Sequence, residues 1–99
     1  MHKHVIWSPL SENDFQQILN YLNENWDYKV ANHFIDLTEQ IVNQISINPR
    51  QYPIIYRKKS IRKCVLTKHN SLFYRVRKDR IEILRIYDTR EDPVSLSFK

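Results

Sequence analysis

The residues of this sequence that could do chemistry are mainly cations. Between Glu39 and Asp79 there is no acidic residue, whereas ten lysines and arginines fall in that interval. Their side chains bind and neutralise phosphates and carboxylates, and arginine stays charged at physiological pH. Such a concentration of positive charge predicts a surface that meets an anionic partner. The ten residues are Arg50, Arg57, Lys58, Lys59, Arg62, Lys63, Lys68, Arg75, Arg77 and Lys78.

The charge outside this interval has the opposite sign. Residues 1–39 contain two bases and six acids, residues 79–99 contain four bases and five acids, and the whole chain carries +5. We therefore expect a cationic sheet laid on an acidic helical layer, although a solvated basic surface without a partner is the alternative interpretation. The residues expected to bind the target are Arg57, Lys58, Lys59, Arg62, Lys63, Lys68, Arg75 and Arg77.

A few of these cations, together with one tyrosine, could do more than bind. Metal-free cleavage of RNA requires a base for the 2′-hydroxyl, cations for the charge on the phosphate, and an acid for the leaving oxygen. Arg62, Arg85 and Arg90 could surround a phosphate with Lys63 beside them. Tyr87 could transfer the proton if its pKa fell from an ordinary value of about 10. Alternatively, Arg85 is a solvated strand residue and Tyr87 an edge packing residue.

Composition argues against other catalytic classes. The chain has no glycine, so a glycine-rich phosphate loop is excluded. Its one cysteine, Cys64, cannot form an internal disulfide, which suits a reducing cytoplasm. His2 and His4 lack further ligands nearby, so we expect no metal and no cofactor. No segment resembles a secretion signal or a membrane span, so we expect a soluble, cytoplasmic protein.

The elements that must position these residues begin with a strand and a helix. His4–Trp7 is rich in β-forming residues and is followed by Ser8-Pro9, so it predicts a short strand. Apolar residues then recur at helical spacing over residues 15–26, and Ser11 is the expected N-cap. Trp7 and Trp26 are expected to pack between the strand and the helices.

A second helix and three strands follow. Apolar residues at helical spacing over residues 30–45 predict a helix that ends before Asn48-Pro49. The short connection over residues 25–28 indicates a helical hairpin. Alternating or β-rich segments predict strands at Ile61–Leu66, Leu72–Arg77 and Arg80–Tyr87, with a reversal at Lys78-Asp79.

The order β-α-α-β-β-β indicates an α+β fold. We expect one domain over residues 1–99, with the helical hairpin packed on one face of a small antiparallel sheet. Alternation leaves open which face of each strand meets the helices. In the strand over residues 72–77 it places Leu72, Tyr74 and Val76 on one face and Phe73, Arg75 and Arg77 on the other. In the strand over residues 80–87 it places Ile81, Ile83, Arg85 and Tyr87 on one face and Glu82, Leu84 and Ile86 on the other.

Taken in order, several motifs resemble a known family. Toxins of the RelE/ParE superfamily are similar over residues 3–93, in the start Val5-Ile6-Trp7-Ser8-Pro9, the helix end Ile47-Asn48-Pro49, and the run Phe73-Tyr74-Arg75-Val76 followed by residues 81–93. The resemblance implies the toxin of a type II toxin–antitoxin pair. It also implies a small antitoxin partner, with an acidic tail, that wraps the domain and neutralises it. No membrane is expected to take part.

The resemblance leaves two targets open. RelE-like members cleave mRNA in the ribosomal A site, whereas ParE-like members block DNA gyrase without nuclease chemistry. Nuclease-type relatives carry a basic residue where this chain has Ser71, and a His or Tyr near the chain end, where this chain offers Leu96 and Phe98. The long helical hairpin also resembles ParE. We therefore expect ParE-like growth inhibition through gyrase. A RelE-like ribosome-dependent mRNA endonuclease is the alternative, and a non-toxic nucleic-acid-binding module is the second.

Overall fold

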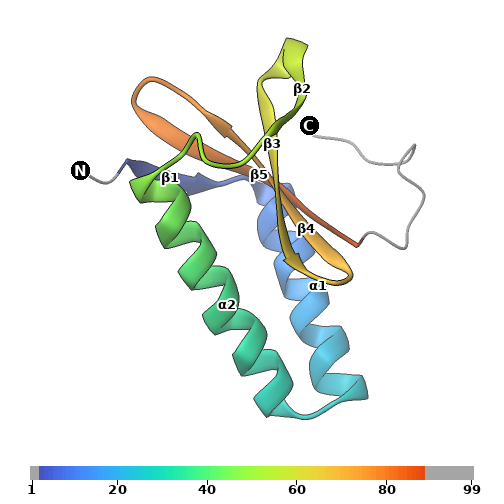
Figure 1. Cartoon of the computed structure of the whole chain (residues 1–99). Coiled ribbons are helices and arrows are strands. Elements are labelled where there is room, and N and C mark those ends of the chain that lie inside the picture. Colours follow the sequence, from blue (N-terminus) through green and yellow to red (C-terminus); the bar gives the residue numbers. More distant parts are fainter. Residues whose placement is uncertain (1–2, 89–99) are drawn as a thin grey trace.

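The structure is a computed structural model that describes residues 3–88. Two helices cover one face of a five-stranded sheet with the strand order β1-β5-β4-β3-β2 (Figure 1). The predicted α+β fold is confirmed, and the structure adds one short strand and one 3-10 turn. The elements are β1 His4–Trp7, α1 Pro9–Asn25, α2 Tyr28–Ile47, β2 Ile54–Tyr56, η1 Arg57–Lys59, β3 Ile61–Thr67, β4 Asn70–Val76 and β5 Arg80–Asp88.

The sheet is mixed rather than wholly antiparallel. Strands β2, β3, β4 and β5 pair antiparallel to one another, whereas β1 pairs parallel to β5, with Val5 opposite Ile81. A parallel pair requires a long crossover connection, and here the helical hairpin is part of that connection. Strand β2 was not predicted, because it has only three residues and directly follows Pro53.

The first helix begins earlier than predicted. Ser8, not Ser11, is the N-cap of α1, because its side chain accepts a hydrogen bond from the Ser11 amide at 3.0 Å. Pro9 then occupies the first helical turn, where its missing N–H costs nothing. The Ser8 hydroxyl also donates to the Leu84 carbonyl at 2.8 Å, so a single side chain ties the helix start to β5.

The second helix matches its prediction closely. Asp27 caps it by accepting from the amides of Lys29 and Val30, and it ends at Ile47, immediately before Asn48-Pro49. Trp26, however, does not pack against the first strand as predicted. It lies between the two helices in sequence and is 64% exposed.

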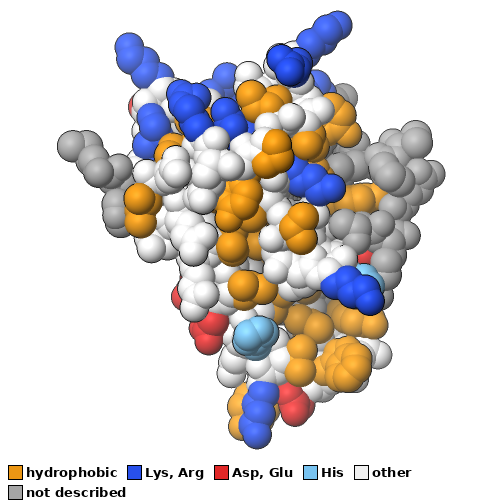
Figure 2. Space-filling model, in the orientation of Figure 1, with side chains coloured by type: hydrophobic (Ala, Val, Ile, Leu, Met, Phe, Trp, Pro, Cys, Tyr) orange, Lys and Arg blue, Asp and Glu red, His pale blue; other side chains and the backbone are white. Residues whose placement is uncertain are grey.

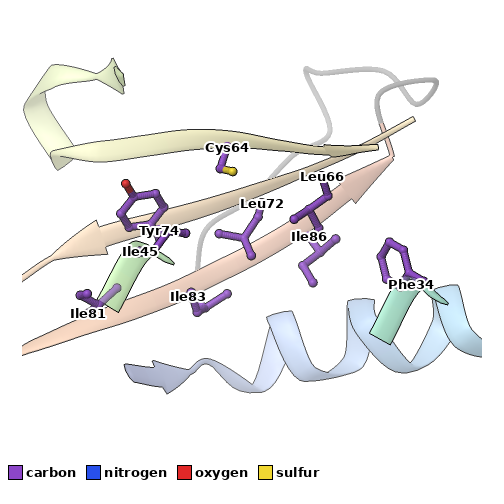
Figure 3. Packing of buried hydrophobic residues seen from close by; sticks show 9 residues of the cluster. All are labelled: Phe34, Ile45, Cys64, Leu66, Leu72, Tyr74, Ile81, Ile83 and Ile86. Carbon is purple, nitrogen blue, oxygen red and sulfur yellow. The ribbon is translucent and has the colours of Figure 1, made fainter. Parts of the chain in front are cut away.

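The main core lies between the helices and the sheet (Figure 3). Phe34 and Ile45 of α2 meet side chains from the three long strands, and Tyr74 donates its hydroxyl to the Pro49 carbonyl at 2.7 Å. Burial raises the pKa of Tyr74 to about 12. The buried members of this cluster are Phe34, Ile45, Cys64, Leu66, Leu72, Tyr74, Ile81, Ile83 and Ile86.

A register shift in β5 changes which residues face the helices. Phe73 pairs with Arg85, but the next residue, Tyr74, pairs with Ile83, so one extra residue is accommodated in β5. Such a bulge reverses the side-chain alternation beyond it. The predicted faces of β5 are therefore correct up to Leu84 and reversed afterwards: Ile86 joins the helix-side core, and Tyr87 joins a second cluster with Ile61, Phe73 and Leu84.

Candidate cationic face of the sheet

The face of the sheet that points away from the helices carries the candidate site. Its centre is the second apolar cluster, Ile61, Phe73, Leu84 and Tyr87. Strand register then places charged residues on the same face, because Ile61 is opposite Arg75, Lys63 is opposite Phe73, and Arg75 is opposite Glu82. The face therefore combines an apolar centre with charged side chains toward the β4–β5 turn.

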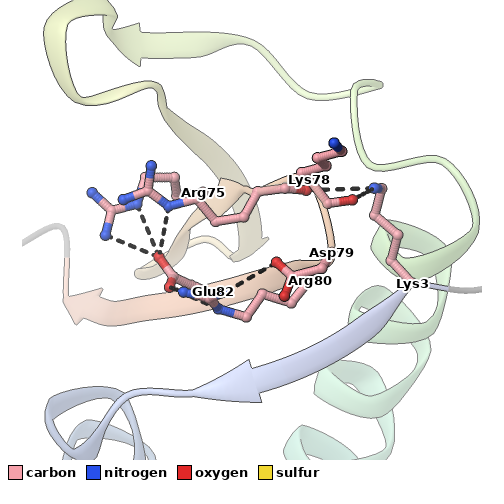
Figure 4. A network of polar contacts seen from close by, with 7 residues as sticks. Lys3, Arg75, Lys78, Asp79, Arg80 and Glu82 are labelled. Carbon is pink, nitrogen blue, oxygen red and sulfur yellow. Dashed lines mark hydrogen bonds and ion pairs between the residues drawn. The ribbon is translucent and has the colours of Figure 1, made fainter.

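Three arginines converge on one carboxylate at this end of the sheet (Figure 4). Arg75 donates from Nε to Oε1 of Glu82 at 3.0 Å, and its Nη2 forms an ion pair with the same oxygen at 2.9 Å. Arg80 donates from Nε at 3.1 Å and from Nη2 at 2.9 Å to Oε2. Arg77 reaches Oε1 from Nε at 3.5 Å. Arg75 and Arg77 thus share Oε1, Arg80 binds Oε2, and one negative charge faces three positive ones.

The electrostatics of the cluster follow from this geometry. Burial of Glu82 acts to raise its pKa, but hydrogen bonds from Arg75 and Arg80 and their charges outweigh it and bring the pKa below the ordinary 4.5. The hydrogen bond to Glu82 and the charge of Asp79 keep the pKa of Arg80 above its ordinary value. Glu82 and Arg80 are therefore both charged at neutral pH, and Glu82 holds the arginines in place.

Lys3 attaches the neighbouring turn to the start of β1. Its Nζ donates to the Lys78 carbonyl at 2.9 Å and to the Arg77 carbonyl at 3.4 Å. The turn itself is closed by the Arg77 amide, which donates to the Arg80 carbonyl at 2.8 Å. The β4–β5 hairpin that presents the arginines is therefore held at its tip as well as along its strands.

Arg62 lies on the opposite face from the other predicted target-binding strand residues. It pairs with Tyr74, a residue of the helix-side core, and its Nη1 donates to the carbonyls of Tyr52 at 2.6 Å and Arg50 at 3.2 Å. Neighbouring strand residues point to opposite faces, so Arg62 and Lys63 cannot both reach a phosphate on one face. The predicted grouping of these two residues around one phosphate is not what the structure has. Arg62 holds the segment that follows α2.

Arg85 is engaged by the first helix. Its Nε and Nη2 donate to Oδ2 and Oδ1 of Asp14 at 2.7 and 2.9 Å, and the amide of Ile86 also donates to Oδ2 at 3.1 Å. Strand β1 pairs with β5 over residues 80–83 and extends no further than Ile83. Asp14 therefore covers the part of the β5 edge that lies beyond the end of β1. Arg85 thus contributes to the joint between α1 and β5.

Tyr87 and Arg90 complete the predicted catalytic set. Tyr87 is only 7% exposed, and its ring packs edge-on against Phe73 with centroids 6.3 Å apart. Arg90 lies outside the described residues. Of the three candidates that the structure describes, Arg62 faces the helices, Arg85 is bound to Asp14, and Tyr87 is buried on the far face. They do not converge on one point.

The remaining predicted target-binding cations are exposed but lie in different places. Arg57, Lys58 and Lys59 form η1, which follows the edge strand β2, and Lys68 lies in the β3–β4 turn. In the view of Figure 2, most blue Lys and Arg side chains lie at the end of the molecule that carries β2 and the β4–β5 turn, and others lie lower, down to the helical end, where they stand beside red acidic side chains. Sequence neighbours in the basic block are thus divided among an edge, two turns and both faces of the sheet.

A second concave surface lies between β1 and the helices. It is a groove of about 710 Å³ lined by apolar side chains of β1, α1 and α2, among them Val5, Trp7 and Phe15. The charged residues Lys3, Glu12 and Glu39 also contribute to its lining. This groove is on the helix side of the sheet, and Lys3 lies between it and the β4–β5 turn.

In the part of the chain that the structure describes, few side chains are placed for thiol chemistry or metal binding. Cys64 is buried in the helix-side core, and burial raises the pKa of its thiol. Within residues 3–88, no three His, Cys, Asp or Glu side chains lie close enough together to hold a metal ion. Neither described helix is apolar enough over a sufficient length to cross a lipid bilayer.

Sequence reasoning missed Arg80, Glu82 and Asp14. A two-residue turn at Lys78-Asp79 pairs residue 77 with 80 and residue 75 with 82, so the hairpin register alone could have brought Glu82 to the arginines. The contact between Asp14 and Arg85 has no comparable signal, because it joins a helix and a strand 71 residues apart.

Comparison with known proteins gives a consistent result. A family model described as the ParE toxin of type II toxin–antitoxin systems, parDE, matches residues 5–93. A solved structure of a chromosomal ParDE toxin–antitoxin system from P. aeruginosa is similar, with a TM-score of 0.75 and 18% identity over 88% of this chain and 96% of that chain. At this identity the structural likeness concerns the fold.

Two solved structures from Helicobacter pylori are also similar. A conserved hypothetical protein is 21% identical with a TM-score of 0.59, covering 90% of this chain and 97% of that chain. A copper-bound mutant toxin is 22% identical with a TM-score of 0.59, covering 89% of this chain and 96% of that chain. No curated protein matches the sequence.

Proposed function

The chain belongs to the ParE toxin family of type II toxin–antitoxin systems, and from this premise we propose that it arrests growth by inhibiting DNA gyrase in the cytoplasm. The contact is made by the sheet face that points away from the helices, through the partly exposed arginine cluster beside the β4–β5 turn. These arginines, with Arg77 exposed over 47% of its side chain, suit a protein interaction site, because arginine residues provide much of the affinity of such sites.

The observation that carries the choice of gyrase over mRNA is the engagement of Arg85 by Asp14. A nuclease needs arginines whose guanidinium groups face the reacting phosphate. Arg85 instead forms two short hydrogen bonds to Asp14, and Arg62 donates to two backbone carbonyls on the helix side of the sheet. Binding without chemistry makes no such demand on either residue.

The toxin is held inactive by a small cognate antitoxin with an acidic tail. The family membership supports such a partner, and the chain's net charge of +5 favours an acidic one. The apolar groove between β1 and the helices is a suitable surface for an amphipathic segment of that partner. A second face thus stays available for recognising the target.

The test compares two purified reactions. We expect the chain to inhibit DNA supercoiling by gyrase and to leave mRNA intact on translating ribosomes. Adding the small protein encoded beside this chain should restore supercoiling. Ribosome-dependent cleavage of mRNA with normal supercoiling would reject the gyrase proposal in favour of the nuclease. Inactivity in both reactions and on induction in cells would reject growth inhibition altogether.

A further inference from the structure

We propose that Arg75, Arg77 and Arg80, held together by Glu82, form a site for the backbone phosphates of duplex DNA. The inference deepens the proposed function, since gyrase acts on DNA and the site lies on the face assigned to target binding. It names the ligand of that face and a residue, Glu82, whose role is to position the arginines. Its test contains no gyrase, so either proposal can fail alone.

The cluster has more hydrogen-bond donors than an internal ion pair uses. Each guanidinium carries five N–H donors. Arg77 uses Nε alone toward Glu82, and Arg75 uses Nε and one Nη. Among the described residues, the other N–H groups of Arg75 and Arg77 have no acceptor. Arg77 is also 47% exposed at its side chain, so its free donors face solvent.

The charge balance points the same way. Besides the three arginines, Lys3 and Lys78 lie at the adjoining turn, and their positive charges are opposed only by Glu82 and the exposed Asp79 among the residues in Figure 4. The group therefore keeps an excess of positive charge. Such an excess on a fixed scaffold costs self-repulsion unless an anion relieves it.

Glu82 makes the cluster rigid. It is opposite Arg75 in the strand register, and its two oxygens hold guanidinium groups from β4 and β5. A free arginine side chain loses rotamer freedom when it binds a ligand, and that loss weakens binding. Here much of the freedom is already lost on folding, so a phosphate meets donors that are already ordered. The planar guanidinium group suits two phosphate oxygens at once.

The position of the cluster favours DNA over an acidic peptide. Extended peptides bind sheets by pairing with a free strand edge. Strand β4 lies between β3 and β5, and β5 is paired to β1 over residues 80–83, so neither strand offers a free edge at the cluster. A phosphate backbone needs only donors on an open face. Arg75, in β4, and Arg77, just beyond its end, present such donors beside one another on that face.

The experiment measures binding of a fluorescent random-sequence DNA duplex to the full-length chain by anisotropy, over a range of salt concentrations. Arg77→Gln removes one exposed donor group, and the matched control Lys29→Gln removes one exposed charge from α2. We expect Arg77→Gln to weaken binding several-fold and to reduce the slope of log affinity against log salt by about 0.9, the value for one phosphate contact. Lys29→Gln should change neither.

Two further variants separate geometry from charge. Arg77→Lys keeps the charge but not the planar fork, so the salt slope should stay while affinity falls. Glu82→Gln raises the net charge by one, so simple attraction would tighten binding, whereas loss of the anchored geometry should weaken it. Circular dichroism establishes that each variant is folded. If Arg77→Gln behaves as Lys29→Gln does, if Glu82→Gln binds DNA more tightly, or if polyglutamate binds and duplex DNA does not, the proposal is wrong.

Discussion

Asp14 of α1 and Arg85 of β5 form a bidentate ion pair, with N···O distances of 2.7 and 2.9 Å, although they lie 71 residues apart in the sequence. Their side chains are 11% and 20% exposed, so the pair is largely shielded from water. Asp14 also accepts from the Ile86 amide at the edge of β5. The pair therefore joins the helical layer to the sheet where β1 has ended.

Removing this carboxylate should destabilise the protein. Asp14→Ala removes the carboxylate to which the Arg85 guanidinium and the Ile86 amide donate, and we expect a loss of about 2–3 kcal/mol in the free energy of unfolding. Urea denaturation measures it. Glu12→Ala, an exposed acid two residues earlier, is the control and should cost well under 1 kcal/mol. Equal losses for the two variants would mean that the ion pair adds nothing to stability.

The position of the helix cap can be tested in the same way. Ser8→Ala removes the acceptor of the Ser11 amide and the donor to the Leu84 carbonyl. We expect a cost of about 1–2 kcal/mol in the free energy of unfolding. Ser11→Ala removes only a hydroxyl that donates to the Ser8 carbonyl, and it should cost less. A larger loss for Ser11→Ala would instead identify Ser11 as the cap.

Acid should weaken the cluster at Glu82. The pKa of Glu82 is lower in the folded state than its ordinary 4.5, so ionised Glu82 stabilises the fold above that value. The stabilisation is lost as the pH falls through the folded-state pKa. The melting temperature of the wild type should therefore exceed that of Glu82→Gln at about pH 6, and the difference should shrink toward about pH 3. Glu24→Gln, at an exposed position on α1, is the control. A difference that does not change with pH would contradict the shifted pKa.

The sequence predicted well what depends on local periodicity. The apolar repeat over residues 30–45 and the stop at Asn48-Pro49 located α2 to within a few residues, and alternation assigned the faces of β4 correctly. Both patterns arise from backbone geometry within a single element. The α+β fold followed from their order.

What depends on contacts between elements was not predictable. The bulge in β5 inserts one residue against β4, and nothing in the local sequence marks it, so Ile86 and Tyr87 were assigned to the wrong faces. Likewise, cations that are close in sequence do not necessarily lie on one surface of the folded protein. Arg62 and Lys63 are neighbours in the chain, yet alternation sends them to opposite sides of the sheet. The arginine cluster required Glu82, an acid just outside the basic block.

Substitutions at Tyr87 test whether this residue acts in packing or in catalysis. Its ring is buried against Phe73 on the outer face of the sheet. Tyr87→Phe keeps this ring contact, so we expect a cost of no more than about 1.5 kcal/mol in the free energy of unfolding, with growth arrest in induced cells unchanged. Tyr87→Ala, the matched truncation, removes the ring and should cost about 3–5 kcal/mol. Urea denaturation and growth curves measure the two effects. If Tyr87→Phe is folded but no longer arrests growth, the hydroxyl takes part in chemistry, and the mRNA endonuclease becomes the better account of this toxin.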